Sequence, residues 1–303
     1  MGTDQSRRAT VTGAYSRRMD LRFDDGTSAS ARIKGKRLKP VCGDRVCAEP
    51  IENESDWLIT DIEQRKNELT RPDARGRTDV LAANVTCLVA MAAPEPAPDW
   101  FIIDRYLAAA ETMHADAIVV YNKADVAQPT QETREAMDDY RRCGYAALLC
   151  SAVSGDGLVE LEEQLADRVT IIVGQSGVGK SSVINRLVGD GRQKTGDVSA
   201  SSGEGKHTTV NSVMIELPSG GYVIDSPGVR DYAPAIEDPD EVVRGFREIN
   251  QSGEACRFAN CRHLREPDCA VKAAVDDGDI SARRYESYRR LLRLANDLVS
   301  KKY

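Results

Sequence analysis

The stretch Val169-Thr-Ile-Ile-Val-Gly-Gln-Ser-Gly-Val-Gly-Lys-Ser-Ser182 joins an apolar run to a glycine-rich turn and then to the start of a helix-forming segment. Residues 174–181 fit the pattern GxxxxGK[ST], in which backbone N–H groups cradle phosphate oxygens. We expect Lys180 to reach the β- and γ-phosphates and the Ser181 hydroxyl to bind Mg²⁺. The residues expected to contact the nucleotide here are Gly174, Gln175, Ser176, Gly177, Val178, Gly179, Lys180, Ser181 and Ser182.

A second motif indicates which base is bound. Asn122-Lys123-Ala-Asp125 follows an apolar run and fits NKxD, the guanine-reading motif of GTPases. The Asp125 carboxylate only accepts hydrogen bonds, so it can pair with the ring N–H and the amine of guanine, whereas adenine would leave it poorly paired. Ser151-Ala152 ends the next apolar run, where a backbone N–H can meet the guanine carbonyl. The sequence therefore predicts GTP and argues against an ATPase or a small-molecule kinase.

Two switch segments are also expected. Asp225-Ser-Pro-Gly228 fits DxxG, so Asp225 would hold Mg²⁺ through water and the Gly228 N–H would meet the γ-phosphate. Thr208 and Thr209 lie between this motif and the phosphate loop, and one of them is expected to sense Mg²⁺ and the γ-phosphate. We favour Thr209 as the magnesium ligand.

No common motif identifies the group that would activate the attacking water. Many GTPases place glutamine directly after DxxG, but Val229 stands there and cannot hydrogen-bond to water. Intrinsic hydrolysis is therefore expected to be slow. His207 is the candidate catalytic group, because an imidazole can donate or accept a proton near pH 7. The alternative is an exposed loop histidine with no role.

The order of these motifs predicts a circularly permuted domain. An ordinary GTPase runs from the phosphate loop through DxxG to NKxD, whereas NKxD and Ser-Ala come first in this chain. Permutation is tolerated because domain termini usually lie at the surface and close together. The permuted order also places the segment after DxxG directly before the C-terminal region.

Patterning outside the motifs predicts three domains. Short alternating runs over the first seventy residues, punctuated by glycines, favour a small β-barrel at 1–72. Arg71-Pro72 and residues 73–78 are interpreted as a linker. Apolar runs alternating with helical patterns then favour an α/β domain at 73–235, with a hairpin across Pro218-Ser219-Gly220. Residues 236–303 are expected to be helical, ending in a long helix with arginines opposite its apolar face.

A cysteine–histidine cluster lies in the C-terminal region. Cys256-x4-Cys261-x-His263-x5-Cys269 offers three thiols and one imidazole, a set that suits one tetrahedral structural zinc ion. The surrounding residues are mostly polar, so this region is expected to need the metal for its shape. The other five cysteines are interpreted as buried free thiols, and they are Cys42, Cys47, Cys87, Cys143 and Cys150.

Charge is distributed unevenly along the 303 residues. Residues 1–40 hold ten Lys and Arg against four acids, and residues 281–303 hold seven against two, although the whole chain carries −7. Two basic ends around an acidic middle suit two contact surfaces for a polyanion, and solvated surface charge is the alternative. The sequence has no run of eighteen apolar residues and no secretory signal, so we expect a cytoplasmic protein without a membrane span.

The combination of barrel, permuted motif order and cysteine–histidine cluster resembles the RsgA (YjeQ) family of bacterial GTPases. The resemblance covers essentially the whole chain, and further matching stretches are residues 43–46, 65–72 and 104–107. It implies an OB-fold barrel, contact with rRNA, and GTP hydrolysis stimulated by the small ribosomal subunit during its late maturation. It also implies a hydrophobic residue at Val229 and a catalytic role for His207. Ser226 and Val210 depart from the family, which commonly has threonine at both positions.

Three functions remain in view. The leading hypothesis is a monomeric GTPase that uses GTP, Mg²⁺ and one structural zinc, and that is stimulated by the small ribosomal subunit. A second is a nucleotide-gated RNA-binding module in which hydrolysis is incidental. A third is a permuted GTPase that acts on the large subunit or another RNA, but such proteins lack this barrel and this zinc cluster.

Overall fold

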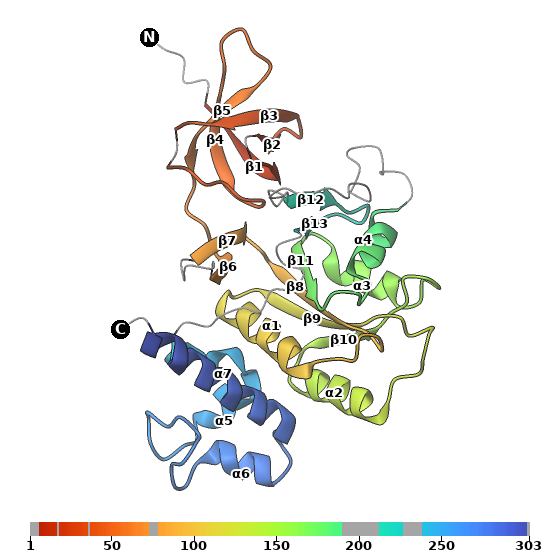
Figure 1. Ribbon diagram of the computed structural model, residues 1–303, viewed down its shortest axis with the longest axis vertical. Helices are drawn as coiled ribbons and strands as arrows, with labels where there is room; N and C mark the ends of the chain where they lie inside the picture. Colours follow the sequence, from red (N-terminus) through yellow and green to blue (C-terminus); the bar gives the residue numbers. More distant parts are fainter. Residues whose placement is uncertain are drawn as a thin grey trace. The chain divides into compact units, whose positions relative to one another are not determined.

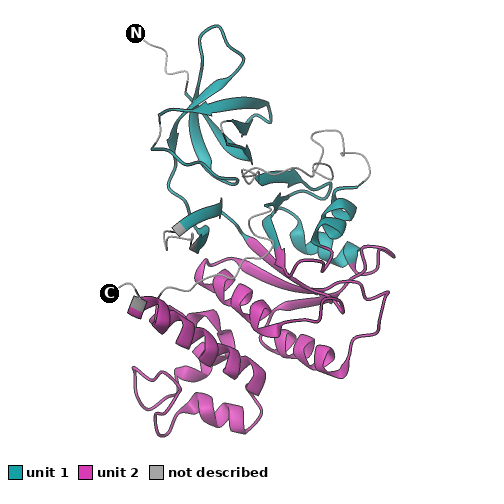
Figure 2. Cartoon of the chain, in the orientation of Figure 1, with its two compact units in different colours: residues 1–86, 158–172, 180–231 teal, residues 87–157, 173–179, 232–303 magenta. Residues whose placement is uncertain are grey.

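A computed structural model describes residues 6–16, 18–35, 37–72, 78–189, 212–226 and 238–301. The chain forms two compact units, which Figure 2 shows in teal and magenta. The first comprises residues 1–86, 158–172 and 180–231, and the second comprises residues 87–157, 173–179 and 232–303. Each unit thus gathers segments that are far apart in the sequence.

The first unit begins with a closed five-stranded barrel (Figure 1). Its strands are β1 (Arg7–Ala14), β2 (Met19–Phe23), β3 (Ser28–Ile33), β4 (Arg45–Pro50) and β5 (Trp57–Ile62). β1 pairs with both β2 and β4, β2 pairs with β3, and β5 pairs with both β3 and β4, so the sheet closes on itself. Alternate residues such as Val11, Leu21 and Ile59 fill the interior. The predicted OB-fold barrel is confirmed.

The linker interpretation of Arg71 and Pro72 is wrong. Both residues lie in β6 (Glu68–Pro72), which pairs antiparallel with β7 (Thr78–Ala83) in a two-stranded sheet. Leu69 is buried, so one face of β6 has an apolar anchor that the charged neighbours conceal in the sequence. Both strands of a two-stranded sheet are edges, where proline is tolerated because no ladder hydrogen bond is lost.

The remaining part of the first unit carries the strands that flank the switch segments. Its elements are α3 (Leu158–Leu165), β11 (Val169–Gly174), α4 (Lys180–Val188), β12 (Ser212–Glu216) and β13 (Tyr222–Asp225). β13 runs parallel to β11 and antiparallel to β12, which confirms the predicted hairpin. β12 also pairs with β1 of the barrel, with Val213 opposite Gly13.

The second unit contains a parallel sheet with helices between its strands. Its strands are β8 (Cys87–Ala92), β9 (Asp116–Tyr121) and β10 (Ala146–Leu149), and its crossover helices are α1 (Trp100–Thr112) and α2 (Gln131–Arg142). β9 pairs in parallel with both β8 and β10. Every residue of β8 is buried, as expected of a strand covered on both faces. The predicted α/β architecture is confirmed.

The C-terminal region of this unit is helical. It consists of η2 (Pro239–Glu241), η3 (Val243–Gly245), α5 (Arg247–Gly253), α6 (Ala270–Asp276) and α7 (Ala282–Lys301). Its apolar cluster includes Phe246, Tyr288 and Leu292, together with Ala108 of α1. Arg289 and Arg293 are exposed on α7 as expected, but Arg284 is an exception, fully buried and paired with carboxylates. Among the described helices, none combines the length and apolarity needed to cross a bilayer.

Candidate nucleotide site and metal centre

Parallel strands bring the two base-reading motifs to one edge of the sheet. Asn122 directly follows β9, and Ser151-Ala152 follow β10 shortly after its end, so both motifs lie at carboxyl ends of adjacent strands. The Asn122 amide is buried; its Nδ2 donates to the Val178 carbonyl at 2.9 Å, and its Oδ1 accepts from the Ala152 N–H at 3.2 Å. One side chain therefore ties the NKxD, Ser-Ala and phosphate-loop segments together.

The two other residues of the NKxD motif are held from different sides. The Ser151 hydroxyl donates to Oδ1 of Asp125 at 2.5 Å, and the carboxylate itself is exposed, so a base can approach it. Lys123 adopts a left-handed backbone conformation, with φ of 61°, and its Nζ donates to the Glu95 carbonyl at 2.8 Å. Sequence reasoning missed Glu95, because no local pattern links it to a motif 28 residues away.

The phosphate loop lies close to the base-reading segment. Gly179 has φ of 93°, and a Cβ there would lie 2.4 Å from Nδ2 of Asn122, so glycine is required on both grounds. The Gln175 side chain accepts a hydrogen bond from the Asp99 backbone N–H at 3.4 Å. Ser176 and Gly177 are exposed at the tip of the loop. Such a turn can present backbone N–H groups to phosphates.

The predicted cation and magnesium residues begin helix α4 in the first unit. Lys180 is buried at its first position, and Ser181 and Ser182 are exposed in its first turn. Asp225 ends β13, which runs parallel to β11. The hydroxyl of Ser226 accepts a hydrogen bond from that of Ser212 at 2.8 Å, so serine fills the DxxG position with a paired hydroxyl.

Several predicted residues cannot be compared with the structure. Five of them lie outside the described residues, and they are His207, Thr208, Thr209, Gly228 and Val229. The catalytic assignment of His207 and the choice of switch threonine therefore stay predictions.

The four cysteine and histidine side chains of the C-terminal cluster come together. One ligand atom from each of Cys256, Cys261, His263 and Cys269 lies within 4.8 Å of all the others. The Cys256 and Cys269 sulfurs are 3.8 Å apart, and His263 Nδ1 is 3.4 and 3.5 Å from them. Ligands about 2.3 Å from a tetrahedral zinc ion would be about 3.8 Å apart, so the set fits this metal.

The surroundings of the cluster shift the pKa values of Cys256 and His263 toward the protonation states that bind a metal. Burial acts to raise the pKa of Cys256, but hydrogen bonds from the Val271 and Ala270 amides outweigh it and hold the pKa below its usual value. Burial also lowers the pKa of His263, which keeps the imidazole neutral. Burial raises the pKa of Cys261 to about 12, so metal binding must displace its proton.

Residues outside the cluster brace its loop. Glu266 accepts hydrogen bonds from the Arg262, Leu264 and Arg265 amides, and these outweigh burial and lower its pKa to about 2. The hydroxyls of Tyr285 and Tyr288 donate to the His263 and Arg262 carbonyls. The helical spacing of the two tyrosines suits the apolar face of α7, and nothing in the sequence pattern reveals this role of their hydroxyls.

Comparison with known proteins places these features in one family. The model of the RsgA GTPase family matches residues 62–234. A protein of Haemophilus influenzae named small ribosomal subunit biogenesis GTPase RsgA is 36% identical over 307 residues, covering 99% of this chain and 88% of its own. A protein with the same name from Pectobacterium carotovorum is 37% identical, covering 93% of this chain and 83% of its own.

Solved structures agree with this assignment. The crystal structure of YjeQ from Thermotoga maritima matches with a TM-score of 0.77 and 29% identity, covering 97% of this chain and 99% of that one. The structure of YloQ, described as a circularly permuted GTPase, matches with a TM-score of 0.75 and 25% identity, covering 98% of each chain. The chain therefore belongs to the RsgA family of circularly permuted GTPases.

Proposed function

We propose that this GTPase binds the small ribosomal subunit and hydrolyses GTP to GDP and phosphate in a subunit-stimulated cycle during late subunit maturation. The names of the relatives support the small subunit as partner. The single observation that carries the nucleotide assignment is the Asn122 side chain, which bonds both Val178 of the phosphate loop and Ala152 of the Ser-Ala segment. Base-reading and phosphate-binding groups are thus held in one arrangement.

The proposed roles follow the chemistry of each group. Asp125 accepts hydrogen bonds from guanine, the Ala152 N–H meets the guanine carbonyl, and Lys180 pairs with the β- and γ-phosphates. Ser181 and Thr209 ligate Mg²⁺, which neutralises phosphate charge, and Asp225 holds it through water. His207 acts on the attacking water. The cluster of three cysteines and one histidine holds one zinc ion as a structural support.

The proposed division of labour follows the three sequence regions. Residues 1–72, which contain the barrel of β1–β5, bind RNA; residues 73–235 form the GTPase domain, and residues 236–303 form the zinc-binding helical domain. The basic ends contact rRNA, and affinity for the subunit should therefore fall with salt. Several of these cations are already engaged: Arg7 pairs with Asp25, and Arg284 with Asp104 and Glu248. We therefore assign rRNA contact to the remaining basic side chains. The protein acts as a cytoplasmic monomer.

Steady-state GTP hydrolysis by the purified full chain tests this function. It is measured alone, with purified small subunits and with purified large subunits. Stimulation by small subunits alone is the expected result, whereas equal stimulation by both subunits, or none, contradicts it. Substituting His207→Ala should abolish the stimulation and leave rRNA binding intact. Stimulation that survives this substitution would show that another group, not His207, acts on the attacking water.

A further inference from the structure

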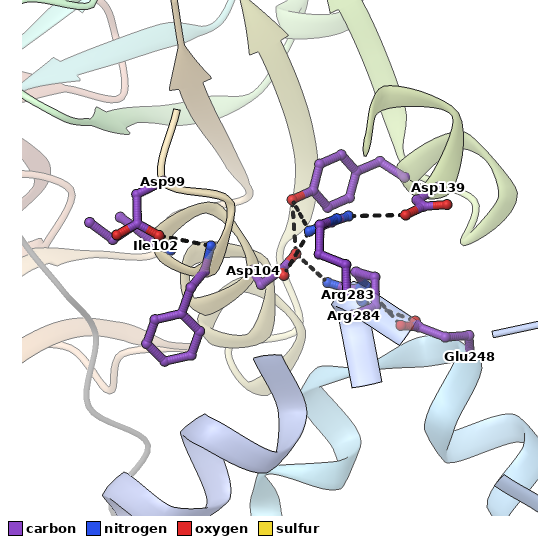
Figure 3. A network of polar contacts seen from close by, with 9 residues as sticks. Asp99, Ile102, Asp104, Asp139, Glu248, Arg283 and Arg284 are labelled. Carbon is purple, nitrogen blue, oxygen red and sulfur yellow. Dashed lines mark hydrogen bonds and ion pairs between the residues drawn. The ribbon is translucent and has the colours of Figure 1, made fainter. Parts of the chain in front are cut away.

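A buried ionic cluster joins helices α1, α5 and α7 of the second unit (Figure 3). Asp104 and Arg284 are both fully buried, with Arg284 Nη1 2.9 Å from Asp104 Oδ1. The other nitrogens of the same guanidinium, Nε and Nη2, donate to Glu248 at 2.8 and 3.0 Å. Arg283 Nη1 and the Tyr140 hydroxyl also donate to Asp104, at 2.9 and 2.8 Å. The matching stretch at residues 104–107, which the sequence left unexplained, thus supplies the central carboxylate.

This ionic cluster fixes how α7 lies against α1 and α5, and it need not increase the stability of the fold. Replacing a buried ion pair by apolar residues of similar volume is often neutral for stability, so such a pair is weak evidence of stabilisation. The planar Arg284 fork instead fixes α7 against a carboxylate of α1 and a carboxylate of α5 at once. We call the cluster of Asp104, Glu248 and Arg284 the joint. Close packing beside it leaves no room for a larger residue at Gly245, because a Cβ there would lie 2.6 Å from the Cβ of Ala108 in α1.

The N-terminal end of α1 meets the nucleotide motifs. The Asp99 carboxylate caps the helix by accepting from the Phe101 and Ile102 amides at 3.0 and 3.3 Å. The Asp99 backbone N–H donates to Gln175 of the phosphate loop, and the Glu95 carbonyl accepts from Lys123 of the base-reading motif. Segment 95–99 therefore touches both halves of the nucleotide site and continues directly into the helix that carries Asp104.

The other side of the joint reaches the metal-binding loop. Tyr285 follows Arg284 directly in α7, and Tyr288 lies one turn further on. Their hydroxyls donate to the carbonyls of His263 and Arg262, within the loop formed by residues 256–269. His263 itself adopts a left-handed backbone conformation, with φ of 55°, so its carbonyl direction is part of a constrained turn.

We propose that Asp104 and Arg284 are positioning residues that couple guanine nucleotide binding to the order of the metal-binding loop. Nucleotide bound by Lys123 and the phosphate loop restrains segment 95–99 and α1. The buried ion pair transmits that restraint to α7, whose tyrosines restrain the loop. By linkage, a restrained loop strengthens nucleotide binding by the same factor. The inference rests on the proposed nucleotide site and requires no particular ribosomal partner.

Amide hydrogen exchange of the zinc-loaded full chain, with and without GDP and Mg²⁺, tests the coupling. We expect GDP to slow exchange about fivefold or more in residues 256–269 as well as in the phosphate loop. In Arg284→Met the slowing should persist at the phosphate loop and disappear at residues 256–269. Arg244→Met is the control, since Arg244 is exposed in η3 of the same unit and pairs with Glu241, and it should keep both effects.

Each outcome is informative. Slowing at the phosphate loop but not at residues 256–269 of the unsubstituted protein overturns the coupling, and slowing at residues 256–269 that survives Arg284→Met overturns the role of the joint. The absence of slowing at both places overturns the proposed nucleotide site instead. Arg284→Met leaves the buried Asp104 and the half-buried Glu248 without this partner and can fail to fold. The triple variant Asp104→Asn, Glu248→Gln, Arg284→Met removes all three charges together and should give the same loss of coupling.

Discussion

The loops after β9 and β10 are joined by hydrogen bonds of the Asn122 amide and of the Asp125 carboxylate. The loop of residues 256–269 is instead joined by thiols, an imidazole and tyrosine hydroxyls. The first set rests on the end of a buried parallel sheet and includes the fully enclosed Asn122. The second exposes Phe258 and Leu264 and has few apolar side chains of its own. We conclude that the nucleotide loops are organised by the fold, and that the metal-binding loop depends on its ligands and on α7.

Removing the metal should produce the largest difference in amide protection between the metal-binding loop and the nucleotide loops. Structural zinc contributes about 10–16 kcal/mol of binding free energy in small zinc domains, and this energy serves as folding energy. A strong chelator added to the zinc-loaded protein should therefore abolish amide protection in residues 256–269, while β8 and β9 keep theirs. Protection of this loop that persists in verified metal-free protein would show that side-chain contacts alone are sufficient.

Breaking the buried ion pair should have the next largest effect. Arg284→Met takes the shared cation from the buried Asp104 and the half-buried Glu248. Asp104 keeps its bonds from Arg283 and Tyr140, so we expect a cost near the lower end of the about 3–5 kcal/mol typical of a broken buried pair. We expect urea denaturation followed by tryptophan fluorescence to show this loss, because Trp100 lies in α1 beside the joint. The exposed Arg244→Met control should change the free energy of unfolding by less than about 1 kcal/mol. Equal effects of the two substitutions would contradict the structural account.

Asp125→Asn should alter the nucleotide site without unfolding it. The substitution removes an acceptor for two guanine donors, each worth about 1.5 kcal/mol or more when the acceptor is charged, so GTP affinity should fall about a hundredfold. The amide N–H of asparagine can donate to the extra carbonyl of xanthine, so xanthosine triphosphate should bind better than GTP. Titration of both nucleotides measures this reversal, with the exposed Asp138→Asn as control. Unchanged preference for GTP would remove Asp125 from the base site.

Features built from residues close together in the sequence could be predicted, whereas features built from distant residues could not. Asn122, the phosphate loop and the cysteine–histidine cluster could be predicted as candidates because each belongs to a short pattern, and the structure brings the residues of these patterns together. The burial of Arg284 could not be predicted because its partner Asp104 lies 180 residues away and no spacing links them. Segment 95–99 was missed for a similar reason, since its contacts to Lys123 and Gln175 are formed by the tertiary fold. β6 was overlooked because charge and proline conceal one buried leucine.

The smallest expected effect concerns the hydroxyl of Tyr288. Burial raises its pKa, so the hydroxyl stays protonated and remains a donor to the Arg262 carbonyl, 2.8 Å away. Tyr288→Phe should keep the edge-to-face contact with Phe246 and lose only this hydrogen bond, worth about 1 kcal/mol. We therefore expect zinc to be released to a chelator about fivefold faster, with nucleotide affinity altered by no more than the same factor. A release rate equal to that of the unsubstituted protein would mean that the metal ligands alone hold the loop, and that α7 contributes its packing but not its hydroxyl groups.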